Sequence, residues 1–181
     1  ENIVRILGSE IKDDKISILM EYVPGASLST QLKQFGPFSE EFARKYTRQL
    51  VEALVYCHGA GVVHRDIKGA NILATLNGNP KLADFGSAKR LADVEQKESL
   101  SEDFTYTTEW TAPEVFSQGE FNSKVDIWSL GCVIIEMITA QAPWAEHKFN
   151  NREQAMVFIG SSRDIPAIPH KLSAQGQEFL L

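Results

Sequence analysis

A polar segment between two short apolar runs constrains this chain more than any other feature of its sequence. Residues 64–73 read His-Arg-Asp-Ile-Lys-Gly-Ala-Asn-Ile-Leu, which places an acid, a cation and an amide at Asp66, Lys68 and Asn71. The aliphatic runs on either side have the length of strands. A second polar turn follows thirteen residues after Asn71, where residues 84–86 read Asp-Phe-Gly. The sequence therefore predicts two polar turns, each directly after a short strand.

Helical periodicity dominates the chain after two strands near its start. Residues 3–7 and 16–22 are rich in β-branched side chains and are separated by a turn-like Lys-Asp-Asp-Lys, which predicts a hairpin. Residues 91–108 are polar and aperiodic, so we expect a long loop there. Apolar residues recur at helical spacing elsewhere. We expect helices from Ser27, over 39–58, from Ser123 through Ile138, over 153–159 and from Ser173.

Composition and charge exclude several classes of protein. The chain is 43% hydrophobic and 23% charged, which is typical of a globular protein and fits disorder, collagen or coiled coil poorly. Its 18 Lys and Arg residues against 24 Asp and Glu residues disfavour a nucleic-acid binder, which usually has a basic face. The longest apolar run, 127–140, is short and contains Glu136. We therefore expect neither nucleic acid nor a membrane among the partners.

The two cysteines, Cys57 and Cys132, both fall within apolar helical patterns. Two cysteines are too few to provide a disulfide scaffold for 181 residues. We expect buried free thiols in a reducing compartment, and hence an intracellular, cytoplasmic protein.

A third short motif, Ala-Pro-Glu at residues 112–114, completes an ordered set. Taken singly, each triplet is an ordinary polar turn or helix start. In this order and at these separations, they resemble the C-terminal lobe motifs of eukaryotic protein kinases. The resemblance implies an α+β, protein kinase-like fold. It would comprise mostly the helical C-terminal lobe, with the hinge and the last strands of the N-terminal lobe.

The resemblance assigns chemistry to the two polar turns. Phosphoryl transfer from ATP requires neutralised phosphate charge, a correctly placed hydroxyl and a proton acceptor. Asp66 corresponds to the acid that accepts the hydroxyl proton, and Lys68 to the cation that steadies the phosphate, which tyrosine kinases usually lack. Asn71 and Asp84 correspond to ligands of Mg²⁺, which prefers hard oxygens. The implied reaction uses ATP and Mg²⁺ on serine or threonine, with Asp66, Lys68 and Asn71 as catalytic residues.

Residues 18–25, Ile-Leu-Met-Glu-Tyr-Val-Pro-Gly, resemble the strand and hinge beside the adenine of ATP. A plain core strand ending in a turn is a compatible interpretation. The resemblance puts Met20 in the gatekeeper place, and Asp126 where an acid of the central helix anchors the catalytic loop. The implied ATP-binding residues are Met20, Glu21, Val23, Leu73 and Asp84.

Regulation is implied by the residues around Asp66 and in the loop that follows Asp84. Arg65 stands where a phosphate on the activation loop often meets a basic pocket. Each hydroxyl in that loop is as readily a solvated loop residue as a phosphorylation site. Thr107 corresponds to a threonine that contacts the catalytic acid and lysine, so its first interpretation is structural. The candidate regulatory residues are Arg65, Ser99, Ser101, Thr105, Thr107 and Thr108.

Two segments most resemble the mitogen-activated protein kinase kinase kinases: residues 67–71, Ile-Lys-Gly-Ala-Asn, and residues 21–28, Glu-Tyr-Val-Pro-Gly-Ala-Ser-Leu. The resemblance implies a place in a MAP kinase cascade and a protein substrate such as a downstream kinase. Residues 106–111 depart from the pattern, reading Tyr-Thr-Thr-Glu-Trp-Thr where relatives usually have Gly-Thr-Pro-Tyr-Trp-Met. That segment contacts the residue after the acceptor, so the departure bears on peptide specificity.

The resemblance covers residues 1–181 but only part of the family's domain. The sequence contains neither a Gly-x-Gly-x-x-Gly loop nor a Val-Ala-Ile-Lys strand. We therefore expect a partial kinase domain, with residues 1–22 as the end of the small lobe and 23–181 as hinge and large lobe. Two functions stay open: an active Ser/Thr kinase, inactive as this fragment alone, and a truncated or pseudokinase-type scaffold that binds partners without transfer. The four catalytic and metal-binding residues favour the enzyme.

Overall fold

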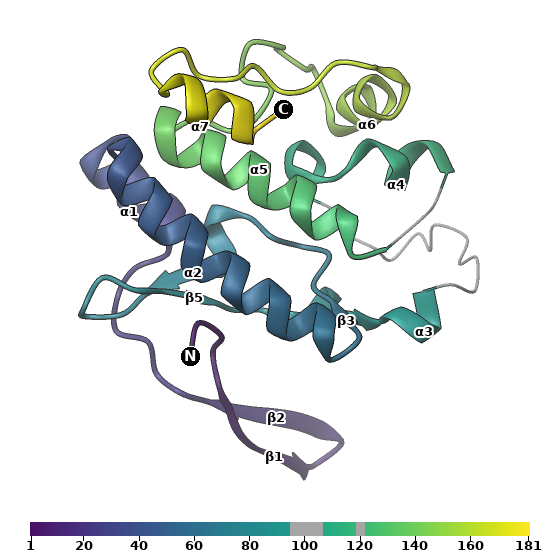
Figure 1. The fold of residues 1–181 in the computed structure, drawn as a ribbon. Coiled ribbons are helices and arrows are strands. Elements are labelled where there is room, and N and C mark those ends of the chain that lie inside the picture. The colour runs from purple at the N-terminus through teal and green to yellow at the C-terminus, as the bar shows by residue number, and fades with distance from the viewer. Residues whose placement is uncertain (95–106, 119–121) are drawn as a thin grey trace.

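A computed structural model describes residues 1–94, 107–118 and 122–181. Figure 1 shows a two-stranded hairpin at one end of the molecule, a body of helices at the other, and short strands between them. The N-terminus lies below α2, and the C-terminus lies beside α7. This α+β arrangement is the fold class expected from the sequence.

Strands β1 (Ile6–Lys12) and β2 (Lys15–Met20) form the antiparallel hairpin. The two turn residues, Asp13 and Asp14, have φ angles of 50° and 59°. Two left-handed residues make the tight turn whose twist matches that of the flanking strands. The sequence predicts a first strand over residues 3–7 and a four-residue turn. The observed strand begins later, at Ile6, because Ile3 forms an isolated bridge with Leu82, and it continues to Lys12 because the two aspartates complete the turn by themselves.

Helices α1 (Leu28–Phe35) and α2 (Glu40–Gly59) both begin at a serine cap. The side chains of Ser27 and Ser39 each accept a hydrogen bond from the backbone N–H three residues later. These bonds satisfy N–H groups that have no partner within the helix. The helix predicted over 39–58 is confirmed, and its apolar face enters the core through Ala43, Tyr46, Leu50, Ala53, Leu54 and Cys57.

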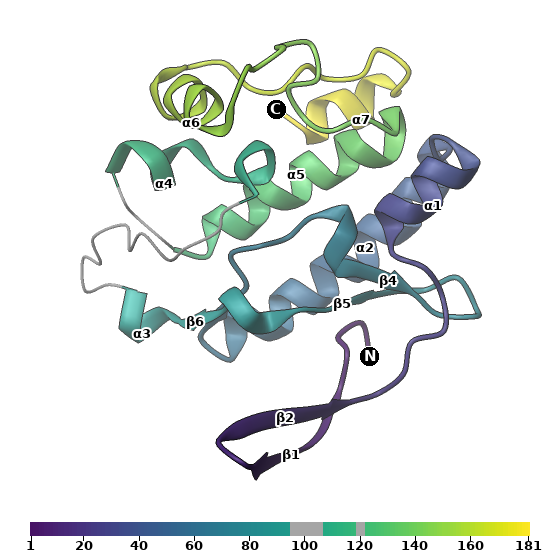
Figure 2. The same cartoon turned by 180° about the vertical axis from the view of Figure 1, so that it is seen from behind.

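Two further pairs of short strands flank the polar loop, which we define as residues 64–71. Strand β3 (Val62–Val63) pairs with β6 (Lys89–Arg90), and β4 (Ile72–Ala74) pairs with β5 (Pro80–Leu82), both antiparallel. Figure 2 shows β4 and β5 crossing in front of α2. The polar loop therefore connects β3 to β4, and the Asp-Phe-Gly turn follows β5.

Helix α5 (Lys124–Thr139) is the centre of the helical body, and its buried residues include two acids, Asp126 and Glu136. A helix that is apolar on nearly every side belongs in an interior. The core cluster joins apolar residues of α5 to those of α1 and α2. In the described part of the chain, no helix has the length and hydrophobicity to cross a membrane. The remaining longer helices are α4 (Pro113–Gln118), α6 (Arg152–Ser161) and α7 (Ala174–Phe179).

The loop predicted over residues 91–108 begins with one helical turn, α3 (Leu91–Val94). Leu91 packs against the small apolar cluster around Val63, and its N–H donates to the Gly61 carbonyl at 2.7 Å. These contacts with distant residues explain the turn, which the local sequence does not indicate. Short 3₁₀ turns occur at η1 (Gly69–Asn71), η2 (Phe85–Ser87) and η3 (Thr108–Trp110).

Candidate active site

A buried carboxylate from α5 holds the backbone of the polar loop. Asp126 is 0% exposed, and its two oxygens accept hydrogen bonds from the N–H groups of His64 and Arg65, both at 2.9 Å. His58 Nε2 lies 2.8 Å from the Oδ2 atom of Asp126. Arg65 has a φ of 69°, a left-handed conformation that non-glycine residues rarely adopt. The anchoring role implied for Asp126 is confirmed, and it fixes the backbone immediately before Asp66.

His64 links the two polar turns as a neutral ring. Its Nε2 lies 3.0 Å from the Ala83 carbonyl oxygen, which only accepts, so Nε2 carries the proton. Its Nδ1 therefore accepts a hydrogen bond from the Asp66 N–H, at 3.3 Å. Burial lowers the pKa of His64 because the charged ring would lose its hydration, although nearby carboxylates oppose this effect. The ring also packs against Phe85, with centroids 4.6 Å apart.

Asp66, Lys68 and Thr107 form a polar triad. Lys68 Nζ lies 2.8 Å from Asp66 Oδ2 and 2.6 Å from Thr107 Oγ1. Because an ammonium group only donates, the threonine hydroxyl accepts from Lys68 and donates its own proton to Asp66 Oδ1, at 2.9 Å. The Asp66 side chain keeps 12% exposure, so the carboxylate is reachable. The structure thus contains the contact that the resemblance implied for Thr107.

Asn71 adjoins the triad through its amide nitrogen. Its Nδ2 donates to the Asp66 carbonyl oxygen and to Asp66 Oδ2, both at 2.9 Å. Both amide hydrogens are used by these bonds, which leaves the oxygen Oδ1 for a cation. The exposed carboxylate of Asp84 is a second hard oxygen donor. This donor set fits Mg²⁺, which typically takes one or two protein carboxylates and completes its shell with phosphate and water oxygens.

Asp84 stands at the start of η2 in a left-handed conformation, with φ 62° and ψ 74°. Its Oδ1 accepts a hydrogen bond from the Gly86 N–H at 3.2 Å. A Cβ added at Gly86 would lie 3.1 Å from that oxygen, closer than ordinary van der Waals contact. A side chain at this position would therefore require the Asp84 carboxylate to shift by a few tenths of an ångström.

The segment between β2 and α1 is fastened to β4. The Ala74 N–H donates to the Ala26 carbonyl at 3.2 Å, and Ser27 forms a backbone bridge with Leu73. A Cβ added at Gly25 would lie 2.8 Å from the carbonyl carbon of Ala74, so this approach depends on glycine. Leu73 therefore lies beside Ser27, just after the residues predicted to contact adenine, and its own contact with ATP stays a prediction.

The Glu21 carboxylate connects the same segment to β5. Its Oε1 accepts hydrogen bonds from Lys81 Nζ at 2.7 Å and from the Arg5 N–H at 2.8 Å. The hydrogen bond from Lys81, assisted by the one from Arg5, lowers the pKa of Glu21. The Glu21 side chain is thus held by hydrogen bonds from Lys81 and Arg5. Of the other predicted ATP contacts, Val23 is half-buried and Met20 is 56% exposed.

A hollow of about 900 Å³ lies between the N-terminal segment, α2 and the β4–β5 turn. Its lining includes Arg5, Glu21 and Lys81, but none of Asp66, Lys68, Asn71 or Asp84. The candidate active site is therefore identified from the hydrogen bonds and charges of these four residues, and not from this hollow.

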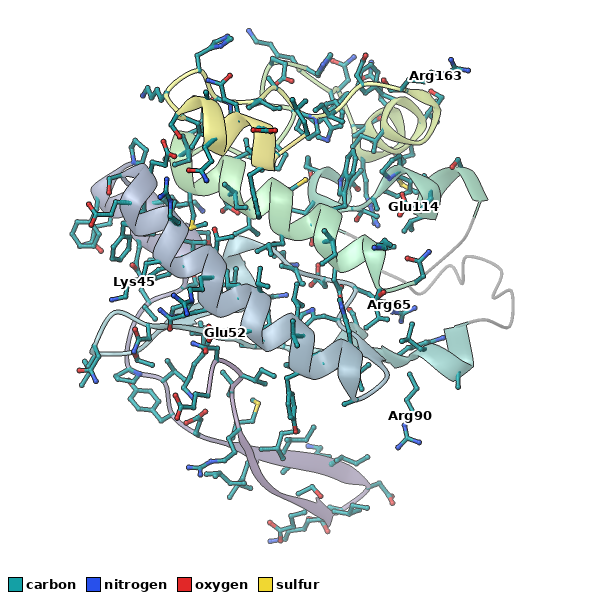
Figure 3. The ribbon with its side chains drawn as sticks, in the orientation of Figure 1. Lys45, Glu52, Arg65, Arg90, Glu114 and Arg163 are labelled. Carbon is teal, nitrogen blue, oxygen red and sulfur yellow. The ribbon has the colours of Figure 1, made fainter. Side chains whose placement is uncertain are left out.

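The predicted regulatory residues occupy different environments. Arg65 Nε donates to the Ser87 carbonyl at 2.7 Å, and Figure 3 shows Arg65 near α5, whereas Arg90 projects from the body. Thr108 is 3% exposed and accepts a hydrogen bond from Arg152 Nε at 3.2 Å, so its phosphorylation would require this segment to move. The hydroxyls of Ser99, Ser101 and Thr105 lie outside the described residues. Regulation by these residues stays a prediction.

Sequence-based prediction missed one residue of this region. Glu136 on α5 is 6% exposed, and its Oε2 accepts hydrogen bonds from the Gly69 N–H at 3.1 Å and from Trp110 Nε1 at 3.0 Å. Burial raises the pKa of Glu136, and these two bonds oppose that effect. A signal was available, because Glu136 is the single acid of the apolar run 127–140. Spacing alone did not indicate which loops would meet it.

Comparison with known families identifies the class to which this fold and site belong. Residues 1–180 match the family described as "Protein kinase domain". The chain belongs to the protein kinase domain family, as its three motifs predicted.

The similar curated proteins define the branch of that family. They include mitogen-activated protein kinase kinase kinase ANP1 of Arabidopsis thaliana, 46% identical over 180 residues. Mitogen-activated protein kinase kinase kinase 3 of Homo sapiens is 42% identical over 183 residues, and mitogen-activated protein kinase kinase kinase A of Dictyostelium discoideum is 42% identical over 180. Each alignment covers 99% of this chain but only 27%, 29% and 19% of the respective relative. The predicted relationship is confirmed, and the chain spans less than a third of these relatives.

Proposed function

We propose that this chain is the large lobe and hinge of a protein serine/threonine kinase that transfers the γ-phosphoryl group of ATP to a protein. The observation that carries the proposal is the environment of Asp66, whose carboxylate is contacted by Lys68, Thr107 and Asn71. The three neighbours orient the Asp66 carboxylate, and its side chain stays partly exposed, so that a substrate could reach it. A general base requires this kind of placement within reach of the proton that it accepts.

The proposed chemistry divides among four side chains. Asp66 orients the substrate hydroxyl and accepts its proton at a carboxylate oxygen. Lys68 brings positive charge to the transferring phosphate, and Asn71 and Asp84 hold Mg²⁺ through their oxygens. When bound, Mg²⁺ would neutralise phosphate charge, and catalysis of phosphoryl transfer depends mainly on such charge stabilisation and on positioning. Thr107 keeps Asp66 and Lys68 in register.

We further propose that residues 20–23 bind the adenine of ATP. The backbone groups of Glu21 and Val23 would contact the edge of the base, Met20 would lie at the back of the site, and Leu73 would pack beneath the ring. Attachment of this segment to β4 supports the proposal, because the adenine and phosphate sites would then share one rigid unit. We propose the domain division at residue 22 for the same reason.

The substrate and setting of the reaction are proposed from the relatives. Because the similar proteins are named mitogen-activated protein kinase kinase kinases, we propose a MAP kinase cascade and a downstream kinase as substrate. Dependence on ATP and two buried free thiols favour a cytoplasmic location. Arg65 and the activation-loop hydroxyls are the proposed points of control.

The test is phosphate transfer from radiolabelled ATP to a serine peptide by the full natural protein that contains these residues. Asp84→Asn should abolish Mg²⁺-dependent transfer, and Asp66→Asn should lower the rate about 10²–10⁴-fold, the usual scale for a positioned acid or base. The matched control is Glu52→Gln, an exposed residue of α2 shown in Figure 3. Its surface ion pair with Arg48 contributes little to stability, so its rate should stay near wild type.

An Asp66→Asn rate within a small factor of wild type would contradict the proposed role of this acid. Binding of ATP by the full protein without any transfer would instead favour a scaffold.

A further inference from the structure

Arg152 is a charged residue beside the candidate active site that the proposed chemistry does not use. It is the first residue of α6, and its Nε donates a hydrogen bond at 3.2 Å to the hydroxyl oxygen of Thr108 in η3. The preceding residue, Thr107, donates its own hydroxyl proton to Asp66 at 2.9 Å. A short path therefore connects Arg152 to the acid that is proposed to meet the substrate.

This path limits the distance between the Arg152 guanidinium and Asp66. Adjacent Cα atoms are about 3.8 Å apart and threonine side chains are short, so Arg152 Nε lies within about 15 Å of Asp66 Oδ1. An extended peptide advances about 3.3–3.6 Å per residue. A peptide whose acceptor hydroxyl meets Asp66 can therefore reach Arg152 with a side chain that lies within about four residues of the acceptor.

Most of the hydrogen-bonding capacity of Arg152 is not used by the contact with Thr108. A guanidinium group carries five N–H donors, and this contact uses one of them. No other hydrogen bond and no ion pair joins the guanidinium to residues 1–94, 107–118 or 122–181. Arg152 is also exposed. Its planar group, which matches the geometry of a carboxylate or a phosphate, therefore keeps the donors that such a ligand needs.

The position of Arg152 is unfavourable for the helix that carries it. A cation in the first turn of a helix opposes the helix dipole, whose N-terminal end is positive. Glu153 and Glu109 are the acids nearest in sequence to this contact, yet neither forms an ion pair with Arg152. The buried hydroxyl of Thr108, a residue with 3% exposure, holds the arginine instead. The described residues thus fix the side chain in place without neutralising its charge.

We propose that Arg152 is a specificity-determining residue that binds an anionic side chain, a carboxylate or a phosphate, within about four residues of the acceptor hydroxyl. The inference rests on the proposed kinase function, and it narrows the substrate class to peptides that carry such an anion. Charge complementarity supports it, because the anion would pair with a guanidinium group that no described carboxylate occupies. The hydrogen bond to Thr108 already restricts the arginine side chain, so less side-chain entropy is lost on binding.

The activity test uses the full natural protein, ATP and a neutral serine peptide in which one residue at a time, up to four positions on either side of the serine, is made anionic. Aspartate is compared with asparagine, and phosphoserine with alanine, at each position. At one or two adjacent positions, the wild type should prefer the anion about 5- to 20-fold in kcat/KM, mainly through a lower peptide KM. Preference for phosphoserine alone identifies a substrate that is already phosphorylated, and preference for both anions identifies an acidic sequence.

Three variants of Arg152 test whether this side chain causes the preference. Arg152→Gln removes the charge but keeps an N–H donor for Thr108, so the preference should fall to within about twofold. Arg152→Lys keeps a positive charge without the planar group and should retain part of the preference. Arg152→Glu reverses the charge, so the same position should favour lysine over aspartate. All three should melt close to the wild-type temperature, because residue 152 is exposed.

Arg163→Gln is the matched control for loss of a positive charge. Arg163 is also exposed, it follows the end of α6, and Figure 3 shows it on the opposite side of α6 from α4. This variant should keep the wild-type preference for the anion. If Arg163→Gln reproduces the loss seen in Arg152→Gln, general electrostatic attraction explains the preference and the proposal is wrong.

A binding measurement without transfer separates this inference from the proposed function. A fluorescein-labelled peptide with alanine in place of the acceptor serine cannot be phosphorylated there, and its fluorescence anisotropy gives the Kd. The Kd should be lower with the anion at the preferred position, and Arg152→Gln should remove the difference. This pattern in a protein that transfers no phosphate would refute the kinase proposal and keep the anion site. Transfer without this pattern would refute the anion site alone.

Three kinetic results would overturn the inference directly. The first is a wild-type protein that prefers neither anion at any position tested. The second is a preference that persists in Arg152→Gln. The third is a wild-type preference for lysine over asparagine at these positions, because Glu109 and not Arg152 would then be the charge that meets the peptide.

Discussion

Replacing Asp126 with asparagine exchanges one of the two oxygens that hold the polar loop for an amide NH₂ group. The less damaging orientation keeps an oxygen at the Oδ2 position, which serves both the His64 N–H and His58. The NH₂ group then faces the Arg65 N–H, donor against donor, in place of a 2.9 Å hydrogen bond. Asp126→Ala removes both acceptors, and leaves two backbone N–H groups without them.

The magnitudes follow from the number of groups left unsatisfied. A buried donor without a partner costs about 1–3 kcal/mol, so Asp126→Asn should lower the free energy of unfolding by that amount and Asp126→Ala by about twice as much. At about 2–4 °C per kcal/mol, the asparagine variant should melt several degrees below wild type. Release of Arg65 from its left-handed conformation should also displace Asp66 and lower kcat.

Thermal melting and peptide phosphorylation, measured on the full natural protein, test both effects. The exposed Asp164→Asn serves as the control for loss of a charge alone. The reasoning fails if Asp126→Asn melts with the wild type, or if Asp126→Ala is no less stable than Asp126→Asn. It also fails if the asparagine variant loses stability but keeps wild-type kcat, since the anchor would then not position Asp66.

Two further predictions concern buried titratable groups. Burial lowers the pKa of His64 in the folded protein, so the unfolded chain binds a proton at this ring more readily than the folded chain does. The stability due to the neutral ring is therefore present above about pH 6.5. It is lost as the pH falls through the lower pKa of the folded state. His64→Phe should flatten the fall in melting temperature between about pH 7 and pH 5, and an unchanged slope would contradict this account. Burial also raises the pKa of the Cys132 thiol, so iodoacetamide should modify it at pH 8 only when urea opens the fold, as peptide mapping can measure. Rapid labelling of Cys132 in the native protein would show that the thiol is accessible.

Local patterns in the sequence predicted much of this fold. The serine cap and apolar spacing of α2 are contained within twenty residues, so periodicity places that helix correctly. The three kinase motifs predicted the family. The first of these motifs contains Asp66, Lys68 and Asn71, so the sequence already placed all three in one loop. The extent of β1 depended on the backbone conformation of Asp13 and Asp14, which residue types indicate only weakly.

Contacts between distant residues limited the prediction of the site. The bonds of Glu136 join residues 67 and 26 positions away, and no periodic pattern encodes such a meeting. Asp126 was found because residues 126–131, Asp-Ile-Trp-Ser-Leu-Gly, resemble part of the family's central helix, although its bonds to the polar loop span 62 and 61 positions. The difference is that a motif carries information about three-dimensional contacts, whereas a single acid in an apolar run does not.

The left-handed backbone at Arg65 and Asp84 has a consequence for how this molecule responds to stress. Neither residue is a glycine, so each conformation costs about 1–2 kcal/mol that the surrounding structure must supply. The polar loop is held at Arg65 by Asp126 of α5, and the Asp-Phe-Gly turn is linked to that loop through His64, so both turns would relax if the support from α5 weakened. If packing in the helical body loosened, we expect the backbone at Arg65 and Asp84 to change conformation first. Geometry at the proposed phosphate site would be lost while most of the helices were still folded.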